Sequence, residues 1–304
     1  MAETEVVYPK KSGDLHNVVM DSKRWDGFNF RDNDIVVATW AKSGTTWTQQ
    51  IVAQLIFGGV EMPGALDIAP WVDMVVVPFD EMIAGLEAQE HRRFFKTHLP
   101  ADALDISSKA KYIFIARDGK DVAWSFYNHL VNMTPEFYDQ INSAPGRVGP
   151  PAEPPTGDVR EYFHDWLDNE GGHPMAPYWR TIRSWWDVGH LPNVLMVHFN
   201  NLKADMEGEI RRIAAFLDID IDEAAWPNIV EHCTFDYMKE NADSLSETFK
   251  DAFEGGLKTF VYKGTNGRWR DVLSAEELDE YDKVANSRLT PDCAHWHATG
   301  EMPL

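Results

Sequence analysis

One segment of the chain reads as a buried strand, a tight loop and a helix in direct succession. Residues 35–39 are apolar and partly β-branched, which favours a buried strand, and residues 46–57 carry apolar side chains along one side of a helix. A loop between a strand and a helix directs backbone N–H groups and a helix N-terminus at one point, which suits a phosphate group. The segment therefore predicts an α/β fold with a phosphate-binding loop. The residues of this loop are Lys42, Ser43, Gly44, Thr45 and Thr46.

The loop departs from that of nucleotide triphosphatases, in which Gly, four residues, Gly, Lys and Ser or Thr follow one another. If the second glycine is aligned with Gly44, Thr39 stands in place of the first glycine and Thr45 in place of the lysine. Lys42 lies within the turn instead, where it adds a positive charge. Gly44 lacks the Cβ atom that would block a close approach. The displaced lysine argues against ordinary ATP hydrolysis.

Residues 40–47, WAKSGTTW, resemble the 5′-phosphosulfate loop of the soluble sulfotransferases, which use 3′-phosphoadenosine 5′-phosphosulfate (PAPS) as sulfuryl donor. The resemblance implies that Lys42 stabilises the charge that grows on the leaving phosphate, and that Trp47 covers one face of the adenine. Stabilisation by fixed charges of this kind is the main device of phosphoryl transfer. Similarity to the family extends, in the family's order, from about residue 35 to 270.

A second motif of the family is KTHLP, at residues 96–100, after a strand predicted for residues 92–97. The carboxyl edge of an open α/β sheet is where such folds bind ligands. In sulfotransferases the histidine of this motif takes the proton of the acceptor hydroxyl, so the resemblance implies that His98 is the general base. Its side-chain type suits the task, because much of it is neutral at pH 7. Lys96 is expected to assist Lys42.

Residues 117–127 resemble the family's first 3′-phosphate motif, an arginine after a strand and a serine on the following helix. The strand is predicted for residues 111–116. Ser125 follows Arg117 by slightly more than two helical turns, so both side chains can face one ligand. An arginine fork and a hydroxyl donor would together hold phosphate oxygens.

Residues 261–270 resemble the RKGxxGDW segment, which closes over the 3′-phosphate and the adenosine. Lys263 and Gly264 match this motif. Tyr262 stands where the family has arginine, and Arg268 where it has aspartate, so one guanidinium contact is missing. Two neighbours, Arg268 and Arg270, are the alternatives for replacing it, and the sequence does not choose between them.

Two weaker matches complete the nucleotide site that the resemblance implies. Phe235 matches the aromatic residue that stacks on adenine, within a segment similar to TSFxxMKxN. Cys233 stands where that segment has the threonine that hydrogen-bonds the base. Phe199 matches the tyrosine of the YEDLK segment but lacks its hydroxyl group.

The acceptor is predicted to be a compact apolar or aromatic alcohol, phenol or steroid. Residues 69–79 lie in a segment that the family uses to line its acceptor pocket, and they supply Trp71, Met74 and Phe79. Small-ligand sites are mostly apolar with a few placed polar groups. Residues 132–158 hold six prolines and three glycines, so they are expected to lack regular structure and to form a lid-like excursion.

Composition limits the partners. The formal net charge is −21, which disfavours nucleic acid and anionic membranes, since both bind basic patches. Two cysteines make no disulfide framework, and we expect a reducing cytoplasm. The N-terminus lacks the features of a signal peptide, and no apolar run is long enough for a membrane span. The tail sequence CAHWH, at residues 293–297, is expected to be structural and not a metal site.

The sequence as a whole predicts a single α/β domain over residues 1–304, with a central, mostly parallel sheet flanked by helices on both faces. The resemblance implies sulfuryl transfer from PAPS to a hydroxyl group, with adenosine 3′,5′-bisphosphate as the second product and no metal. A nucleoside or small-molecule kinase and a non-catalytic nucleotide-binding protein remain as alternatives. The family's dimerisation segment is not visible, so the oligomeric state is not predicted. Further elements are predicted for a strand at 194–199 and for helices at 176–188, 205–217, 223–232 and 275–289.

Overall fold

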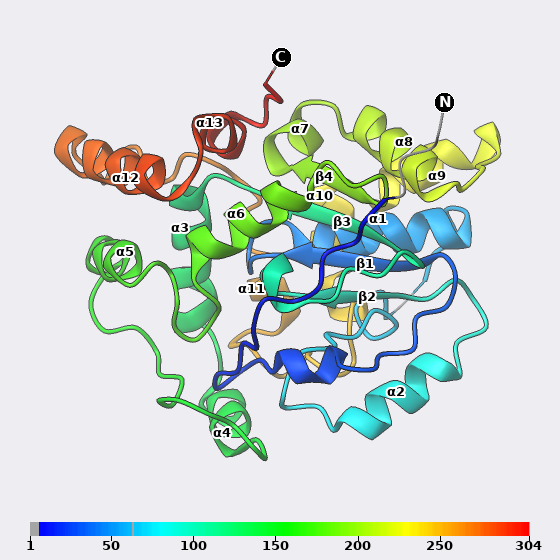
Figure 1. The fold of residues 1–304 in the computed structure, drawn as a ribbon, viewed down its shortest axis with the longest axis horizontal. Coiled ribbons are helices and arrows are strands. Elements are labelled where there is room, and N and C mark those ends of the chain that lie inside the picture. The colour runs from blue at the N-terminus through cyan, green and yellow to red at the C-terminus, as the bar shows by residue number, and fades with distance from the viewer. Residues whose placement is uncertain (1–5, 63, 304) are drawn as a thin grey trace.

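The computed structural model describes residues 6–62 and 64–303. The named strands of this part of the chain form one parallel sheet in the order β2-β1-β3-β4. Helices lie on both sides of the sheet (Figure 1), so the predicted α/β class is confirmed. The strands are β1 (Asp34–Thr39), β2 (Phe94–Thr97), β3 (Ala110–Ala116) and β4 (Val194–His198).

The helices fall between and after these strands. The α-helices are α1 (Thr45–Phe57), α2 (Phe79–Glu87), α3 (Gly119–Val131), α4 (Pro135–Ser143), α5 (Val159–Asp168), α6 (Tyr178–Val188), α7 (Phe199–Ala204), α8 (Met206–Leu217), α9 (Trp226–His232), α10 (Phe235–Glu240), α11 (Leu257–Phe260), α12 (Ala275–Arg288) and α13 (Pro291–Thr299). Short 3₁₀ helices are η1 (Ser22–Trp25), η2 (Ala101–Ala103), η3 (Glu223–Ala225) and η4 (Ala242–Ser244).

The side chains of β1 alternate between two apolar cores. Ile35 and Val37 pack with apolar residues of α1, α8 and α9. Val36 and Ala38 point into the larger core, which α3, α5, α6, α12 and α13 complete. All six residues of β1 are buried, as expected for a parallel strand that is covered on both faces.

The register of the sheet brings the ends of three strands together. Ala38 of β1 pairs with Thr97 of β2, and Thr39 pairs with Ile115 of β3. The residues that follow these three strands therefore leave the sheet at the same edge. They are the loop after β1, His98 after β2 and Arg117 after β3.

Residues 132–158 are more ordered than the sequence predicted. The first third forms helix α4, because Thr134 caps its N-terminus through Phe137 N and Pro135 occupies a first-turn position that needs no N–H partner. Tyr138 and Ile141 are buried on its inner face. The expectation of an irregular excursion is wrong for this part and holds for the chain between α4 and α5.

Other differences concern element ends and six further helices that the sequence analysis missed. Phe199 begins α7 and does not end β4, and β2 is shorter than predicted. The sequence analysis did not identify α2, α5, α7, α10, α11 or α13. The CAHWH residues lie in α13, where Cys293 and His297 are buried and His297 Nε2 lies 2.7 Å from the hydroxyl oxygen of Tyr178.

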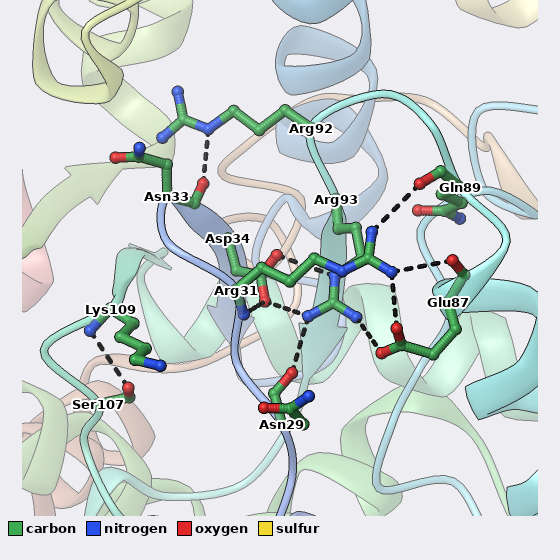
Figure 2. A network of polar contacts seen from close by, with 10 residues as sticks. All are labelled: Asn29, Arg31, Asn33, Asp34, Glu87, Gln89, Arg92, Arg93, Ser107 and Lys109. Carbon is green, nitrogen blue, oxygen red and sulfur yellow. Dashed lines mark hydrogen bonds and ion pairs between the residues drawn. The ribbon is translucent and has the colours of Figure 1, made fainter.

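A buried ion pair joins β1 and β2 at the opposite edge of the sheet. Figure 2 shows the Arg93 guanidinium facing Asp34 and Glu87. Arg93 Nε and Nη2 lie 3.0 and 2.5 Å from the two carboxylate oxygens of Asp34, and Nη1 lies 2.7 Å from Glu87 Oε1. The side chains of Arg93 and Asp34 are only 1% and 2% exposed, so the buried charge of Asp34 depends on Arg93.

We expect Arg93→Ala to lower the free energy of unfolding by about 3–5 kcal/mol, because Asp34 is left as an unpaired buried charge. The control is Arg183→Ala, which removes an ion pair with Asp187 whose side chains are 40% and 53% exposed. That loss should be less than about 1 kcal/mol. Urea unfolding of both variants measures the two losses in the free energy of unfolding. Equal losses would contradict the conclusion that Asp34 depends on Arg93 for its stability in the interior.

Candidate active site

The loop between β1 and α1 has a shape that its glycine permits. Gly44 has a φ of 122°, and a Cβ atom at this position would lie 2.7 Å from Ile115 Cδ1. Inside the loop, Thr45 Oγ1 and Thr39 Oγ1 are 2.8 Å apart and form a hydrogen bond. The hydroxyl group of Thr39 thus ties the end of β1 to the first residue of α1. This contact presents the helix N-terminus to the carboxyl edge of the sheet, where an anion is favoured.

His98 is held in one orientation by the end of β1. Its Nδ1 lies 2.8 Å from the carbonyl oxygen of Thr39. A carbonyl oxygen only accepts, so Nδ1 carries the proton and Nε2 of the neutral ring keeps a free lone pair. The ring of Trp71 meets the imidazole edge-on at 4.6 Å between centroids. Burial, followed by the charge of Lys96, lowers the pKa of His98 to about 3, so the ring is neutral near pH 7.

Two lysines bring positive charge to the same place. Burial, and then the charges of Arg117 and Lys96, lower the pKa of Lys42 to about 7. Burial also lowers the pKa of Lys96 to about 8. Both ammonium groups lie over aromatic rings, Lys42 at 4.1 Å from the centroid of Phe260 and Lys96 at 5.3 Å from that of Trp71. An anion placed between them would offset both the desolvation and the mutual repulsion.

Arg117 binds the loop of residues 261–268. Its Nε and Nη2 donate to Asn266 Oδ1 at 3.0 and 2.7 Å, and Nη2 also donates to Thr265 O at 2.9 Å. The guanidinium lies 4.3 Å from the ring centroid of Phe199. These contacts hold the loop of residues 261–268 against the carboxyl edge of the sheet.

The same loop rests on Phe235. Gly264 has a φ of 59°, and a Cβ atom there would lie 2.6 Å from Phe235 Cδ2. Only glycine allows the backbone to lie this close to the ring. The predicted nucleotide residues Phe235 and Gly264 are therefore brought together by direct packing.

The structure favours one of the two arginines that could replace the missing family arginine. Arg268 lines the cavity at this sheet edge, and its Nε is buried without a hydrogen-bond partner among the described residues. Burial, with a smaller effect from the charge of Arg268, lowers the pKa values of Lys42 and Arg117. Arg270 lies against Trp269, 5.4 Å from its ring centroid, and does not line the cavity.

A cavity of about 450 Å³ collects most of the predicted donor residues. Two predicted residues are not in its wall. Ser43 is buried with its Oγ unpaired among the described residues, and Cys233 is buried with its carbonyl oxygen 2.8 Å from Trp47 Nε1. Thr234, the neighbour of Cys233, lines the cavity instead. The predicted residues in the wall are Lys42, Gly44, Thr45, Thr46, Trp47, Lys96, His98, Arg117, Ser125, Phe199, Phe235, Lys263 and Gly264.

A second, apolar cavity of about 110 Å³ adjoins the first. Trp71 and Met74 line it, as predicted for the acceptor pocket. Phe79 does not, because it starts α2 with 36% of its surface exposed and lies 5.1 Å from the Arg24 guanidinium. Sequence reasoning missed two parts of the wall, which come from α3 and from residues 249–260. A third part comes from residues 133–152, within the segment that the sequence predicted to be a lid-like excursion. The two cavities share Trp71, Lys96, Phe126, His129, Met175 and Phe260.

Comparison with known proteins agrees with this site. The family model described as the sulfotransferase domain matches residues 32–292. The chain belongs to the sulfotransferase family. The motif-based prediction of a PAPS-dependent sulfotransferase enzyme is thereby confirmed.

Similar sulfotransferases span nearly the whole chain. A glycolipid sulfotransferase of Mycobacterium bovis is 31% identical over 306 residues, which cover 93% of each chain. Sulfotransferase 1B1 of Mus musculus is 30% identical over 305 residues, covering 95% of this chain and 96% of the relative. The crystal structure of mouse sulfotransferase SULT7A1 complexed with PAP is similar in fold, with a TM-score of 0.68 and 21% identity over 95% of this chain and 96% of that one.

The residues present suit PAPS, the donor of the sulfotransferase family. A Cβ atom at Gly44 or Gly264 would collide with neighbouring side chains, and Arg268, whose Nε has no hydrogen-bond partner among the described residues, lines the donor cavity. Within residues 6–62 and 64–303, no three His, Cys, Asp or Glu side chains gather so as to hold a metal ion. That transfer needs no metal stays a prediction. Among the described helices, none combines the length and apolarity needed to cross a membrane.

Binding of adenosine 3′,5′-bisphosphate should weaken as pH rises through about 7 to 8. Lys42 and Lys96 have pKa values of about 7 and 8 without ligand. The bound anion favours their charged forms, so binding takes up protons where these groups are partly neutral. Titration calorimetry from about pH 6 to 9, in two buffers of different ionisation enthalpy, measures this uptake.

Lys42→Met is the control for that experiment, because the ligand's own phosphates also titrate. The variant should lose the part of the proton uptake centred near pH 7 and keep the ligand's contribution. An identical pH dependence in the variant would contradict the pKa assigned to Lys42.

Proposed function

We propose that the protein transfers the sulfuryl group of PAPS to a hydroxyl group of a compact apolar or aromatic acceptor. The observation that carries this proposal is the junction of the two cavities. A polar cavity with converging cations meets an apolar one at the ring of Trp71, and His98 contacts that ring. Donor and acceptor can therefore meet beside a neutral histidine.

His98 is the proposed general base. Its hydrogen bond to Thr39 O fixes the proton on Nδ1 and leaves Nε2 free to take the proton of the acceptor hydroxyl. The acceptor oxygen forms a bond to sulfur as the bond between sulfur and the 5′-phosphate oxygen breaks. The acceptor's proton ends on His98, and the electron pair of the broken bond ends on the phosphate.

Lys42, Lys96 and the loop N–H groups are proposed to stabilise the leaving phosphate. Their charge is desolvated, as the lowered pKa values of both lysines indicate, so it acts strongly at short range. Arg117, Ser125 and Arg268 are proposed to bind the 3′-phosphate, since all three line the donor cavity. Phe235 and Trp47 are proposed to enclose the adenine.

The acceptor class rests on the walls of the second cavity, which are mainly aromatic and aliphatic. Such a surface binds a compact apolar molecule and offers little to a glycan. A second acceptor class is a glycolipid, because the mycobacterial relative carries that name at 31% identity. We also propose a cytoplasmic enzyme, since Cys233 and Cys293 are free and buried.

Replacing His98 tests the function directly. His98→Ala should lower kcat about 10²–10⁴-fold with phenols, because general-base catalysis typically contributes that much. His98→Asn is the matched variant, since its amide can still donate to Thr39 O. Both should bind adenosine bisphosphate about as well as the wild type in a thermal-shift assay.

The assay uses PAPS with a panel of phenols, steroid alcohols and glycolipids. Turnover of an unactivated alcohol at the wild-type rate by either variant would rule out His98 as the base. Sulfation of glycolipids alone would favour the second acceptor class and leave the role of His98 intact.

Arg268→Ala should weaken adenosine 3′,5′-bisphosphate binding by about tenfold or more, because a hydrogen bond to a charged group contributes about 1.5–3 kcal/mol. Affinity for 5′-AMP, which lacks the 3′-phosphate, should change much less. Arg270→Ala is the control, since Arg270 lies outside the cavity wall. If Arg268→Ala left the ratio of the two affinities unchanged, the 3′-phosphate would be bound elsewhere.

A further inference from the structure

His129 is a polar residue in the wall that the two cavities share. It lies on α3, one helical turn after Ser125, so both side chains are on the same face of the helix. Ser125 lines the donor cavity only, whereas His129 lines both. The helix thus carries one polar group toward the donor and another to the place where donor and acceptor meet.

The imidazole of His129 is surrounded by aromatic rings. The ring centroids of Phe253, Phe126 and Phe260 lie 4.9, 5.8 and 5.8 Å from its own. Nδ1 of His129 is buried and has no hydrogen-bond partner within the described part of the chain. A buried polar group without a partner is unfavourable, so its presence calls for an explanation, and a bound ligand could supply the missing partner.

Other polar groups of the apolar cavity are already paired. The hydroxyl group of Tyr138 donates to Leu130 O at 2.8 Å, and Trp71 Nε1 donates to Asp73 Oδ2 at 2.6 Å. Lys96 is the cation assigned to the leaving phosphate. Among the described residues that line this cavity, His129 is therefore the neutral side chain with hydrogen-bonding capacity to offer to a ligand.

We propose that His129 determines acceptor specificity by hydrogen-bonding a second polar group of the acceptor, one close to the reacting hydroxyl. The inference rests on the proposed function, because it places the acceptor in the apolar cavity. The chemical class is an ortho-substituted phenol or a vicinal diol. Burial, and then the charges of Lys42 and Lys96, lower the pKa of His129 well below its usual range, so the ring is neutral and offers one donor and one acceptor.

The test compares three phenols of similar shape: 2-methylphenol, 2-methoxyphenol and 2-hydroxyphenol. The wild type should show a higher kcat/KM for at least one of the two oxygen-bearing phenols than for 2-methylphenol. In His129→Phe, which keeps an aromatic ring among Phe126, Phe253 and Phe260, this preference should fall by about tenfold. Because the preference is compared between two enzymes, differences in the intrinsic reactivity of the phenols cancel.

Two further variants control the comparison. His129→Gln retains hydrogen-bonding atoms and should keep part of the preference. Met133→Leu changes an apolar residue of the same cavity and should leave the preference unchanged. An equal loss for all three phenols in His129→Phe, or an unchanged preference, would overturn the proposal.

Acceptor binding to the protein saturated with adenosine bisphosphate separates this inference from the proposed function. If the phenols bind but are not sulfated, the proposed reaction fails, and the ratio of their dissociation constants in wild type and His129→Phe still tests His129. If none of the phenols binds the wild type, both the acceptor class and this inference are overturned.

Discussion

Parallel pairing of β1 with both β2 and β3 is the constraint on which the site depends. The register Ala38–Thr97 and Thr39–Ile115 makes three strands end together. Thr39 then uses both of its polar groups, its hydroxyl for Thr45 and its carbonyl for His98. A shift of one residue in either pairing would turn the side chains of that strand to the opposite core and would change how His98 and Arg117 lie relative to the loop.

Burial of cations gives the site its chemistry in a chain of net charge −21. Long-range attraction does not favour an anionic donor here, and surface charges are screened beyond about 10 Å at 0.1 M salt. Lys42 and Lys96 are instead placed to act at short range; desolvation lowers the pKa of both, and the charges of Arg117 and Lys96 lower that of Lys42 further. Both ammonium groups lie over aromatic faces, Lys42 over Phe260 and Lys96 over Trp71, and the charge of Asp73 partly offsets the desolvation of Lys96.

The sequence predicted what is local and missed what depends on the rest of the chain. The strand, loop and helix around Gly44 were predicted correctly because propensity, loop chemistry and periodicity agree there. Helix α4 was missed because the six prolines of residues 132–158 suggested a loop, whereas Thr134 and Pro135 begin a helix that burial of Tyr138 and Ile141 stabilises. Neither the choice between neighbouring arginines nor the direction of a side chain at a helix start, as at Phe79, follows from spacing alone.

One continuous stretch of chain forms walls of both cavities. Phe249, Phe253 and Leu257 line the apolar cavity, and residues 261–265 line the donor cavity. Phe260 belongs to both, with Lys42 on its face and His129 beside it. If donor and acceptor bind as proposed, the donor would contact residues 261–265 and the acceptor would contact residues 249–260 of the same stretch of chain.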